Sequence, residues 1–437
     1  MDDSPLLKSY FRRLEEFSAL RWTGRVSKSV GYLVESDGPF CSVGEGCAIV
    51  TEDGQAFSGE IIGFRGRTVL SMPLERPSGI RYGDRIVTRG TQPALRVGPD
   101  MLGRVIDGSG KAIDNKPSYR AREYWPLHRE APLPLDRVPI RNPLGCGVRA
   151  IDGLLTCGRG QRVGIFGGSG VGKSTLIGMM TRATSADMTV LALVGERGRE
   201  VREFLEDAIG AEGLARSVVV VSTSDQSPLL RIRAALAATT VAEYFCARGK
   251  HVLLVVDSLT RFSMAQREIG LAAGEPPTAK GYTPSVFTLL ARLIERAGNF
   301  AAGSITAFYT VLMEGDDQQD PLVDAVRALL DGHVILDRRL SAQGHYPPIH
   351  ILDSLSRLMP AVCSAEHLEK ARRIRELLAS YSASEDLIRV GAYQRGADAL
   401  LDRSIAALPG ISGFLRQRKN DPTQFEDTLK ALHALST

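Results

Sequence analysis

A lysine and two hydroxyl residues follow a glycine-rich stretch that stands between an apolar run and a helical pattern. From Gly167 to Ser174 the spacing is G-x4-G-K-S, the spacing of phosphate-binding loops. Glycines let successive backbone N–H groups point into one concavity, and the positive end of the following helix adds to that field. Lys173 would reach the outer phosphates of a nucleoside triphosphate, and the Ser174 hydroxyl would bind Mg²⁺. The stretch therefore predicts a nucleoside triphosphate site made by Gly167, Gly168, Ser169, Gly170, Val171, Gly172, Lys173, Ser174 and Thr175.

Two carboxylates follow two other apolar runs. Asp257 ends the run HVLLVVD, and an acidic group at the end of a buried strand can support a bound Mg²⁺. Hydrolysis also needs a group that orients or deprotonates the attacking water. Glu196 is predicted to be that group because it comes two residues after the run TVLALV. Glu200 is a weaker candidate for the base, and the alternative for Glu196 is a helix-start glutamate that complements the helix dipole.

Arginines are the candidates for stabilising charge in the transition state. Arg197, next to Glu196, would steer that carboxylate or touch phosphate. An arginine from another subunit can contribute on the order of 10³–10⁵ in rate. Arg357, in HILDSLSRLMP, is predicted for this role, and the remaining candidates are Arg261, Arg338 and Arg339.

An aromatic residue before two prolines is suited to stacking on a nucleotide base. This residue is Tyr346, in GHYPP. The residues alone favour a surface tyrosine packed on proline. The nearby His345 and His350 lack carboxylates at the spacing of metal ligands, so no metal is assigned to them.

Alternating strands and helices must position these groups between residues 149 and 355. Continuous apolar runs at 163–166, 189–194, 218–222, 251–256, 303–311 and 333–337 are separated by amphipathic segments. Such runs predict a parallel sheet covered by helices on both faces, an α/β fold. Ligands bind at the carboxyl ends of such strands, which would bring the loops after Phe166, Val194 and Val256 together.

Other patterns flank this α/β region. A helix is predicted over residues 1–22, as either a packed element or a docking helix for a partner, followed by a small β-barrel over 23–95. The predicted ATPase domain covers 96–358, of which 96–148 is a proline-rich connector. Residues 359–437 read as a helical domain in which the basic run RQRK is a solvated face.

Composition limits the function classes. The chain has 437 residues and a net charge of +4, which does not indicate nucleic-acid binding, and the barrel lacks exposed aromatics on a basic face. Its six cysteines form no C-x-x-C pair, which predicts reduced thiols in a cytoplasmic protein. No apolar run approaches the roughly 18 residues of a membrane span, and no signal peptide is present, so any membrane association is expected to be peripheral.

Several segments together resemble one protein family. GRGQRVGIFGGSGVGKSTL, ALVGERGREVREF, VVDSLTRFSMAQREIGLAAGEPPTAKGYTPSVF, GSITAFYTVLMEGDD, DGHVILDRRL and ILDSLSRLMP are similar to the catalytic subunits of the flagellar and injectisome (type III secretion) export ATPases. These proteins are related to the alpha and beta subunits of rotary ATP synthase, and the resemblance implies that the ATPase domain over 96–358 is RecA-like. The resemblance covers residues from about 24 to 430.

The resemblance implies roles for individual residues. It implies that Glu196 polarises the attacking water, that Asp257 supports the metal, and that Arg197 and Arg261 line the γ-phosphate region. Arg357 would be the arginine finger, the arginine that contacts the nucleotide bound by the neighbouring subunit. It also implies that Tyr346 is the adenine platform, which reverses the interpretation from the residues alone.

The resemblance further implies an assembly and a place in the cell. The family forms a homohexameric ring that energises export of unfolded proteins, at the cytoplasmic face of the inner membrane. The N-terminal helix would dock a stator or regulator dimer, and a central stalk, the export gate, chaperones and substrates would be further partners. The Gly-Ala-Tyr of RVGAYQRGADALLDRSIAALPGISGFLRQ favours the flagellar branch, while the following Gln-Arg-Gly also occurs in injectisome enzymes.

Three other functions remain as alternatives. One is a nucleotide-gated module that delivers export cargo, in which hydrolysis is incidental. A rotary synthase subunit is disfavoured by the short helical C-terminal region, the N-terminal helix and the AAGEPP segment. An RNA-translocating hexamer is disfavoured because the barrel lacks a basic aromatic face.

Overall fold

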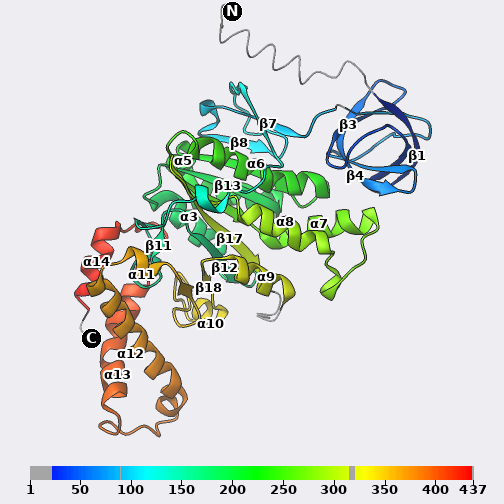
Figure 1. The fold of residues 1–437 in the computed structure, drawn as a ribbon. Coiled ribbons are helices and arrows are strands. Elements are labelled where there is room, and N and C mark those ends of the chain that lie inside the picture. Colours follow the sequence, from blue (N-terminus) through cyan, green and yellow to red (C-terminus); the bar gives the residue numbers. More distant parts are fainter. Residues whose placement is uncertain (1–21, 89, 314–319, 436–437) are drawn as a thin grey trace, which may run out of the picture.

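The fold places a β-barrel at one end of the molecule and a helical hairpin at the other. A computed structural model of the chain describes residues 22–88, 90–313 and 320–435. The helix predicted over residues 1–22 lies almost wholly outside these described residues. Figure 1 shows the barrel in blue, the central sheet with its helices, and the C-terminal helices in orange and red.

The barrel is closed, as the sequence predicts. Its six strands pair antiparallel in the order β1-β2-β5-β4-β3-β6. Alternate side chains point inward and form a small core of their own, with Val34, Ile49 and Ile86 fully buried. The strands are β1 (Thr23–Val30), β2 (Leu33–Asp37), β3 (Gly46–Val50), β4 (Ala56–Arg65), β5 (Thr68–Pro73) and β6 (Arg85–Thr88).

Part of the predicted connector belongs to the central sheet. Strand β8 (Arg104–Asp107) pairs in parallel with β14, and the Arg104 guanidinium binds Asp114 with Nε and Oδ2 2.7 Å apart. Two further strands, β7 (Ala94–Val97) and β9 (Glu123–Pro126), form an antiparallel pair beside it. The connector is thus an edge of the sheet as well as a link from the barrel.

The central sheet is parallel through its core strands, which confirms the prediction. Its order is β19-β18-β12-β17-β15-β13-β14-β8, with only β19 and the short β16 (Gly298–Asn299) pairing antiparallel. The strands not yet bounded are β12 (Arg162–Gly167), β13 (Met188–Glu196), β14 (Ser217–Thr223), β15 (His251–Asp257), β17 (Ser304–Leu312), β18 (Gly332–Ile335) and β19 (Leu355–Ser356).

Helices cover both faces of this sheet because its strands are apolar on both sides. On β15, Leu254 and Val256 pack into the core under one helical layer, while Leu253 and Val255 pack into the opposite core. The first layer contains α6 (Pro228–Cys246), α7 (Leu259–Ala273), α8 (Pro284–Ile294) and α9 (Pro321–Leu329). The second contains α2 (Arg149–Leu154), α3 (Lys173–Ala183), α4 (Gly198–Glu203), the π-helical turn Phe204–Ile209 and α5 (Gly210–Ala215).

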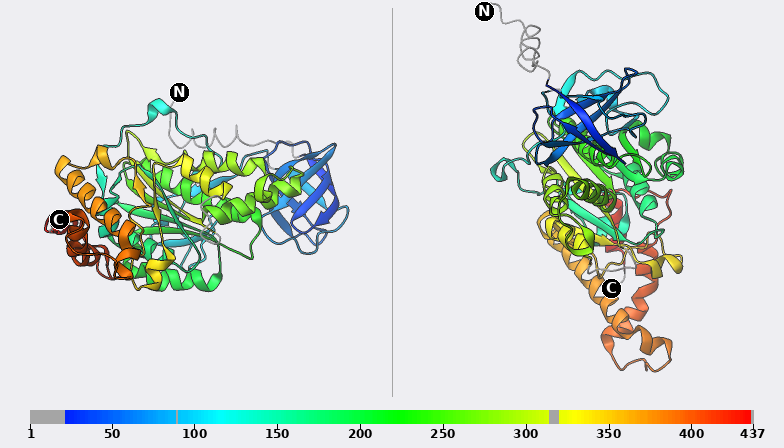
Figure 2. Two further views of the ribbon diagram at one scale, coloured as in Figure 1. Left: turned by 90° about the horizontal axis from the view of Figure 1, so that it is seen from below. Right: turned by 90° about the vertical axis from the view of Figure 1, so that its right-hand side faces the viewer.

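The C-terminal helices pack against α2 and share the core of the second layer. They are α11 (Met359–Val362), α12 (Ala365–Arg389), α13 (Ala399–Leu415) and α14 (Phe425–His433). Phe414 and Leu432 belong to that core, and His367 Nε2 lies 2.7 Å from the carbonyl oxygen of Gly153 in α2. Figure 1 and the right view of Figure 2 show the α12–α13 hairpin extending away from the sheet, at the end opposite the barrel.

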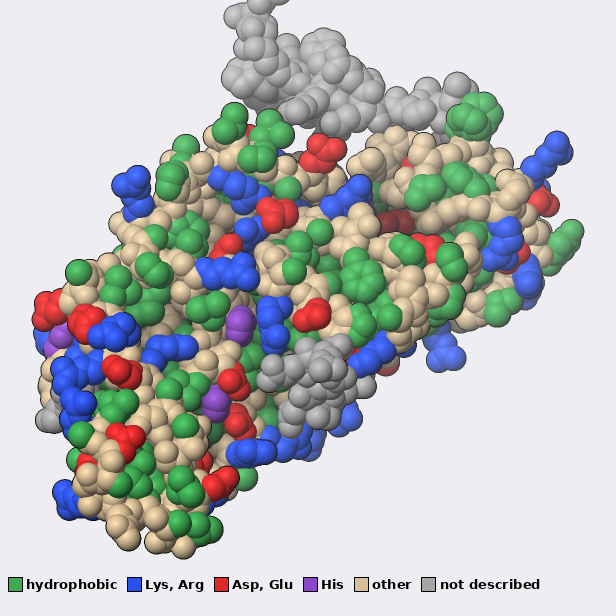
Figure 3. Space-filling model, turned by 60° about the horizontal axis from the view of Figure 1, so that its bottom comes forward, with side chains coloured by type: hydrophobic (Ala, Val, Ile, Leu, Met, Phe, Trp, Pro, Cys, Tyr) green, Lys and Arg blue, Asp and Glu red, His purple; other side chains and the backbone are tan. Residues whose placement is uncertain are grey.

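No helix among the described residues is long and apolar enough to cross a membrane. On the face shown in Figure 3, basic and acidic side chains are interspersed rather than gathered into one basic stripe. This distribution agrees with the small net charge of +4.

Candidate active site

The glycine-rich loop joins β12 to α3 at the carboxyl edge of the sheet. Gly170 and Gly172 have φ values of 77° and 101°, a backbone conformation that side chains with a Cβ rarely adopt. Gly172 is the N-cap of α3, and no side chain caps this end of the helix. The first N–H groups of α3 therefore remain available to an anion, and the helix dipole favours one there.

Lys173 lies under this loop with its ammonium group directed at the loop's own carbonyls. Its Nζ donates hydrogen bonds of 3.0 Å to the carbonyl oxygens of Gly167 and Gly168. Burial lowers the pKa of Lys173, and the negative charges of Asp257 and Glu196 oppose that effect. The ammonium group is thus already held at the phosphate loop by these two hydrogen bonds, without a bound phosphate.

The structure brings most of the predicted residues together around one pocket. A cavity of about 400 Å³ lies between the loop and the ends of β13 and β15. Its walls include Ser169, Gly170, Gly172, Lys173, Ser174, Thr175, Glu196, Arg197, Asp257 and Arg261, together with Glu200 and Leu312. Residues from four separate segments of the sequence therefore face the space where phosphates would sit.

Glu196 is the last residue of β13, half-buried at the edge of the pocket. Burial, then the negative charge of Asp257, raises the pKa of Glu196 to about 7. A carboxylate with a pKa near neutral pH is suited to exchanging a proton with water. The preceding Gly195 has a φ of 71°, and a Cβ there would lie 3.1 Å from the Cβ of Arg261, so only glycine fits this turn.

Asp257 ends β15 and is buried beside Thr310 of β17. The Thr310 hydroxyl donates to Oδ1 of Asp257 at 2.5 Å, which fixes the orientation of the carboxylate. Burial raises the pKa of Asp257, and the Thr310 bond acts in the opposite direction. Sequence patterns did not identify Thr310, because a single threonine within the apolar run of β17 gives no signal of its own.

The donors present fit Mg²⁺. A hydroxyl on Ser174 and a carboxylate on Asp257 line the same pocket, and Mg²⁺ prefers oxygen ligands of this kind with phosphates and waters completing its shell. Among the described residues, no group of three or more His, Cys, Asp or Glu side chains could hold a metal by itself. A site that depends on phosphate oxygens agrees with both observations.

Two arginines border the pocket differently. Arg197 is mostly exposed, and its guanidinium lies 3.6 Å from Glu200. Arg261, near the start of α7, has a buried Nε without a hydrogen-bond partner. A buried donor without an acceptor is unfavourable, and a phosphate oxygen would satisfy it.

Tyr346 lies beside a second, adjoining cavity. This cavity of about 610 Å³ has Gly172, Thr175 and Tyr346 on one side and the segment 416–419 on the other. The basic residues of RQRK, Arg416, Arg418 and Lys419, are exposed, as the interpretation of a solvated face predicts, whereas Gln417 between them is not. Gln417 is buried at 4% exposure, and its backbone N–H donates to the carbonyl oxygen of Tyr346 at 2.8 Å. No local signal identifies a residue that reaches a site more than 240 positions away.

Arg357 lies at the opposite edge of the sheet from the phosphate loop. It follows β19, whose Ser356 pairs with Gly332 at the beginning of β18. In the same register Gly332 lies beside Val163, four residues before the loop begins at Gly167. Four residues of strand span roughly 13 Å, so Arg357 does not reach the pocket of its own chain. Arg338 and Arg339, in α10 (Arg338–Ala342), do not line the pocket either.

Family models match three consecutive parts of the chain. Residues 26–90 match the beta-barrel domain of the ATP synthase alpha/beta family, and residues 147–356 match its nucleotide-binding domain. Residues 363–434 match the C-terminal domain of the T3SS EscN ATPase. The flagellum-specific ATP synthase of Pseudomonas aeruginosa is 51% identical over 417 residues, which cover 94% of this chain and 92% of that protein.

The chain belongs to the family of flagellum-specific and type 3 secretion system ATPases. It is thus an enzyme of the ATP synthase alpha/beta type. The flagellum-specific ATP synthase of Bacillus subtilis is 48% identical over 94% of this chain and 95% of that protein. The type 3 secretion system ATPase of Xanthomonas euvesicatoria is 46% identical over 99% of each chain.

A solved structure in this family has the same fold. The assembled ATPase EscN of the enteropathogenic E. coli type III secretion system superposes with a TM-score of 0.89. It is 43% identical in sequence, and the match covers 94% of this chain and 99% of EscN. The order of barrel, parallel sheet and C-terminal helices is therefore the fold of the export ATPases.

Proposed function

We propose that this chain hydrolyses ATP at a pocket shared between two copies of itself, within a homohexamer that energises flagellar type III protein export. The observation that carries the proposal is the opposed placement of Lys173, Glu196 and Asp257 at one edge of the sheet and Arg357 at the other. One copy would supply the phosphate loop and its neighbouring carboxylates, and the next copy would supply the guanidinium of Arg357.

Each side chain of the pocket has a separate task. The N–H groups from Gly167 to Thr175 and the ammonium of Lys173 bind the phosphates. Ser174 and Asp257 would hold Mg²⁺, which when bound neutralises charge on the phosphate oxygens. Arg197 and Arg261 would contact the γ-phosphate. Glu196 orients the attacking water and accepts its proton, for which a pKa of about 7 suits it.

Tyr346 would stack on adenine in the second cavity. Its ring borders Gly172 of the phosphate loop, so a base held there would remain connected to phosphates in the first cavity. Aromatic side chains stack on the face of a nucleobase whichever base is present. The half-exposed ring of Tyr346 supports this role over a tyrosine that only packs on its neighbouring prolines.

Structures of a related ATPase support the export role. EscN is described as assembled and also in complex with its central stalk EscO. By analogy, this chain would assemble around a stalk, dock a stator or regulator dimer through residues 1–22, and meet the export gate, chaperones and substrates. It would act in the cytoplasm, peripherally at the inner membrane, and without nucleic acid.

The highest identities to this chain belong to the flagellar branch, although the two branches overlap. Flagellum-specific ATP synthases of Pseudomonas aeruginosa and Bacillus subtilis are 51% and 48% identical, against 46% for the type 3 secretion system ATPase of Xanthomonas euvesicatoria, while the flagellum-specific ATP synthase of Aquifex aeolicus is 44% identical. The test is expression in strains that lack either ATPase. Restored motility without restored effector secretion supports the flagellar branch, and the reverse result overturns it.

Glu196→Gln tests the hydrolytic role directly. The variant keeps the size of the side chain but removes the proton acceptor, so ATP binding should persist while turnover falls at least 100-fold. The matched control is Glu200→Gln, a neighbouring pocket carboxylate. An unchanged rate in Glu196→Gln would exclude Glu196 as the base. If Glu196→Gln still supported export in cells, the chain would instead be a nucleotide-gated delivery module.

A further inference from the structure

Three apolar side chains stand exposed on the loop between β9 and β10 (Pro143–Leu144). Leu133 is 68% exposed, Leu135 is 98% exposed and Val138 is 41% exposed. Prolines stand among them at Pro132, Pro134 and Pro139. Because proline restricts the backbone, little conformational freedom is lost when such a loop is covered by a partner. The three apolar side chains lie within six residues of one loop and are all in solvent, which is the pattern of an interaction surface rather than of singly scattered apolar residues. We call Leu133, Leu135 and Val138 the leucine loop.

The base of the leucine loop is held firmly. Arg137 Nη1 donates to the carbonyl oxygen of Ala297 at 2.9 Å, and Arg137 Nη2 donates to Oε2 of Glu295 at 3.0 Å. The N–H of Val138 donates to the carbonyl oxygen of Asn299 at 2.9 Å. The apolar side chains are therefore presented to solvent from a fixed backbone, not from a free coil.

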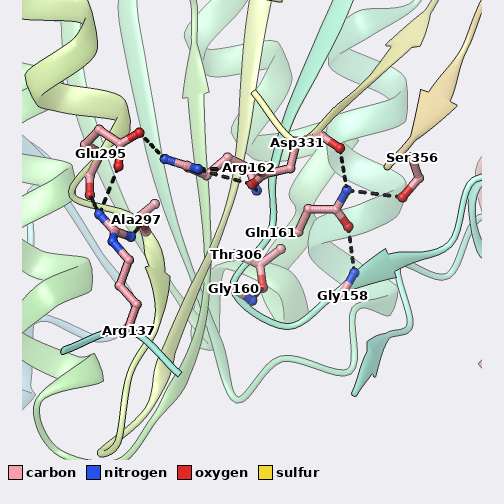
Figure 4. A network of polar contacts seen from close by, with 10 residues as sticks. All are labelled: Arg137, Gly158, Gly160, Gln161, Arg162, Glu295, Ala297, Thr306, Asp331 and Ser356. Carbon is pink, nitrogen blue, oxygen red and sulfur yellow. Dashed lines mark hydrogen bonds and ion pairs between the residues drawn. The ribbon is translucent and has the colours of Figure 1, made fainter. Parts of the chain in front are cut away.

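A chain of ion pairs connects this base to the segment that carries Arg357 (Figure 4). Glu295 binds Arg162 as well as Arg137, and Arg162 Nε donates to Oδ2 of Asp331 at 3.1 Å. The carbonyl oxygen of Asp331 in turn accepts from the N–H of Arg357. Arg162 begins β12 and Asp331 precedes β18, so all these contacts lie at the amino edge of the parallel strands.

We propose that the leucine loop is covered by a second copy of this chain, the same copy whose nucleotide pocket receives Arg357. The proposal rests on the trans role of Arg357 given above. If Arg357 crosses a boundary between two copies, that boundary runs along the amino edge of the sheet. The leucine loop lies on that edge, joined to Arg357 by the Arg137–Glu295–Arg162–Asp331 chain. Because the leucine loop and Arg357 lie on the same edge of the sheet, the copy that receives Arg357 is the partner we infer for the leucine loop.

Leu135→Asp in the full-length chain tests the proposal. The matched control is Leu387→Asp, because Leu387 is another leucine that is 53% exposed but lies on the distant α12–α13 hairpin. Assembly is measured by sedimentation velocity over a range of protein concentrations with a non-hydrolysable ATP analogue. We expect Leu135→Asp to raise the concentration for half-assembly at least tenfold and Leu387→Asp to leave it unchanged. Turnover per subunit should recover at concentrations where Leu135→Asp assembles.

Two results would overturn the proposal. Assembly of Leu135→Asp at the wild-type concentration would mean that the leucine loop is covered by another protein or by none. An equal loss in Leu387→Asp would mean that any added charge weakens assembly.

Hydrogen exchange supplies a second readout that needs no variant. The amides of Leu133 and Leu135 should be protected in assembled wild-type protein relative to dilute protein, and unchanged exchange would overturn the proposal. The proposed function fails separately. A wild-type chain that hydrolyses ATP at full rate while monomeric contradicts the shared pocket, whatever Leu135→Asp does.

Discussion

The backbone N–H of Arg357 donates a hydrogen bond to the carbonyl oxygen of Asp331, with the two atoms 3.0 Å apart. The carboxylate of Asp331 is bound in turn by Arg162, through the backbone N–H at 3.0 Å, Nε at 3.1 Å and Nη2 at 3.2 Å. Gln161 adds a bond from Nε2 to the Ser356 hydroxyl at 3.1 Å. The segment that carries Arg357 is thus fastened to the strand that carries the phosphate loop.

Asp331→Ala should weaken the action of Arg357 without touching a nucleotide. The substitution removes three hydrogen bonds and an ion pair that is partly exposed, so we expect a loss of about 1 kcal/mol in unfolding free energy. Turnover of the assembled protein should fall several-fold while the KM for ATP stays close to wild type. The measurement is steady-state kinetics with urea unfolding alongside, and Asp53→Ala, an exposed carboxylate in a barrel turn, is the control. Unchanged turnover would mean that the contacts of the Asp331 carboxylate with Arg162 do not position Arg357.

The pH dependence of hydrolysis should report Glu196. Because its pKa is raised to about 7, the carboxylate is largely protonated at pH 6 and largely ionised at pH 8. A general base works only when ionised, so kcat/KM should rise with pH, pass its midpoint near pH 7 and level off above about pH 8. The measurement is kcat/KM from pH 5.5 to 9 at constant ionic strength. A rate that is flat across pH 7 would contradict this assignment.

The same pKa shift makes a prediction about stability. A raised pKa means that the folded chain binds the proton more tightly than the unfolded chain, so folding stability falls as pH rises from 4.5 to about 7. Glu196→Gln removes this loss. The variant should exceed wild type by on the order of 1 kcal/mol at pH 8, after solvent screening of a half-buried group, and should match it near pH 4.5. Urea unfolding at both pH values checks the difference.

Gly195→Ala should damage the site through the backbone. Gly195 has a φ of 71°, and the added Cβ would lie 3.1 Å from the Cβ and 3.3 Å from the Cγ of Arg261. We expect a loss of about 2 kcal/mol in stability and at least a tenfold fall in kcat, because Glu196 is the next residue. Gly210→Ala is the matched control, with a φ of 69° and no atom within 4 Å of the new Cβ. Equal kcat values for the two variants would contradict the contact with Arg261.

Thr310→Val should raise the Mg²⁺ requirement. The hydroxyl that orients Asp257 is lost, while the shape of the side chain is kept. We expect the Mg²⁺ concentration for half-maximal ATPase activity to rise about tenfold, an effect of about 1.4 kcal/mol. The control is Thr189→Val on β13, because the buried Thr189 hydroxyl has no hydrogen-bond partner. A Mg²⁺ requirement that changes equally in both variants would count against a specific role for Thr310.

Sequence patterns predicted the parts of the fold that depend on local chemistry. Apolar runs marked β12, β13 and β15 because their strands are buried on both faces, and the residues at their ends, Glu196 and Asp257, were then placed by the rule for parallel sheets. The phosphate loop was clear because its glycines and Lys173 occur at a fixed spacing.

Long-range contacts were not predictable in the same way. Strand β8 joins the sheet through pairing with β14 more than 100 residues later, and its own four residues do not specify a partner. Gln417 reaches the second cavity only because α13 packs on α2. Arg357 was found by type and by family resemblance, whereas its position at the opposite edge of the sheet follows from the register of β18 and β19.

The central claim is that each working pocket contains groups from two copies of the chain. The most direct measurement is ATPase activity of mixtures of Arg357→Ala and Lys173→Ala chains, each of which should be inactive alone. A mixed assembly contains some pockets with an intact Lys173 and an intact Arg357, so activity should reappear and be greatest near equal proportions. No activity at any mixing ratio, with mixed assembly verified by sedimentation, would contradict a shared pocket.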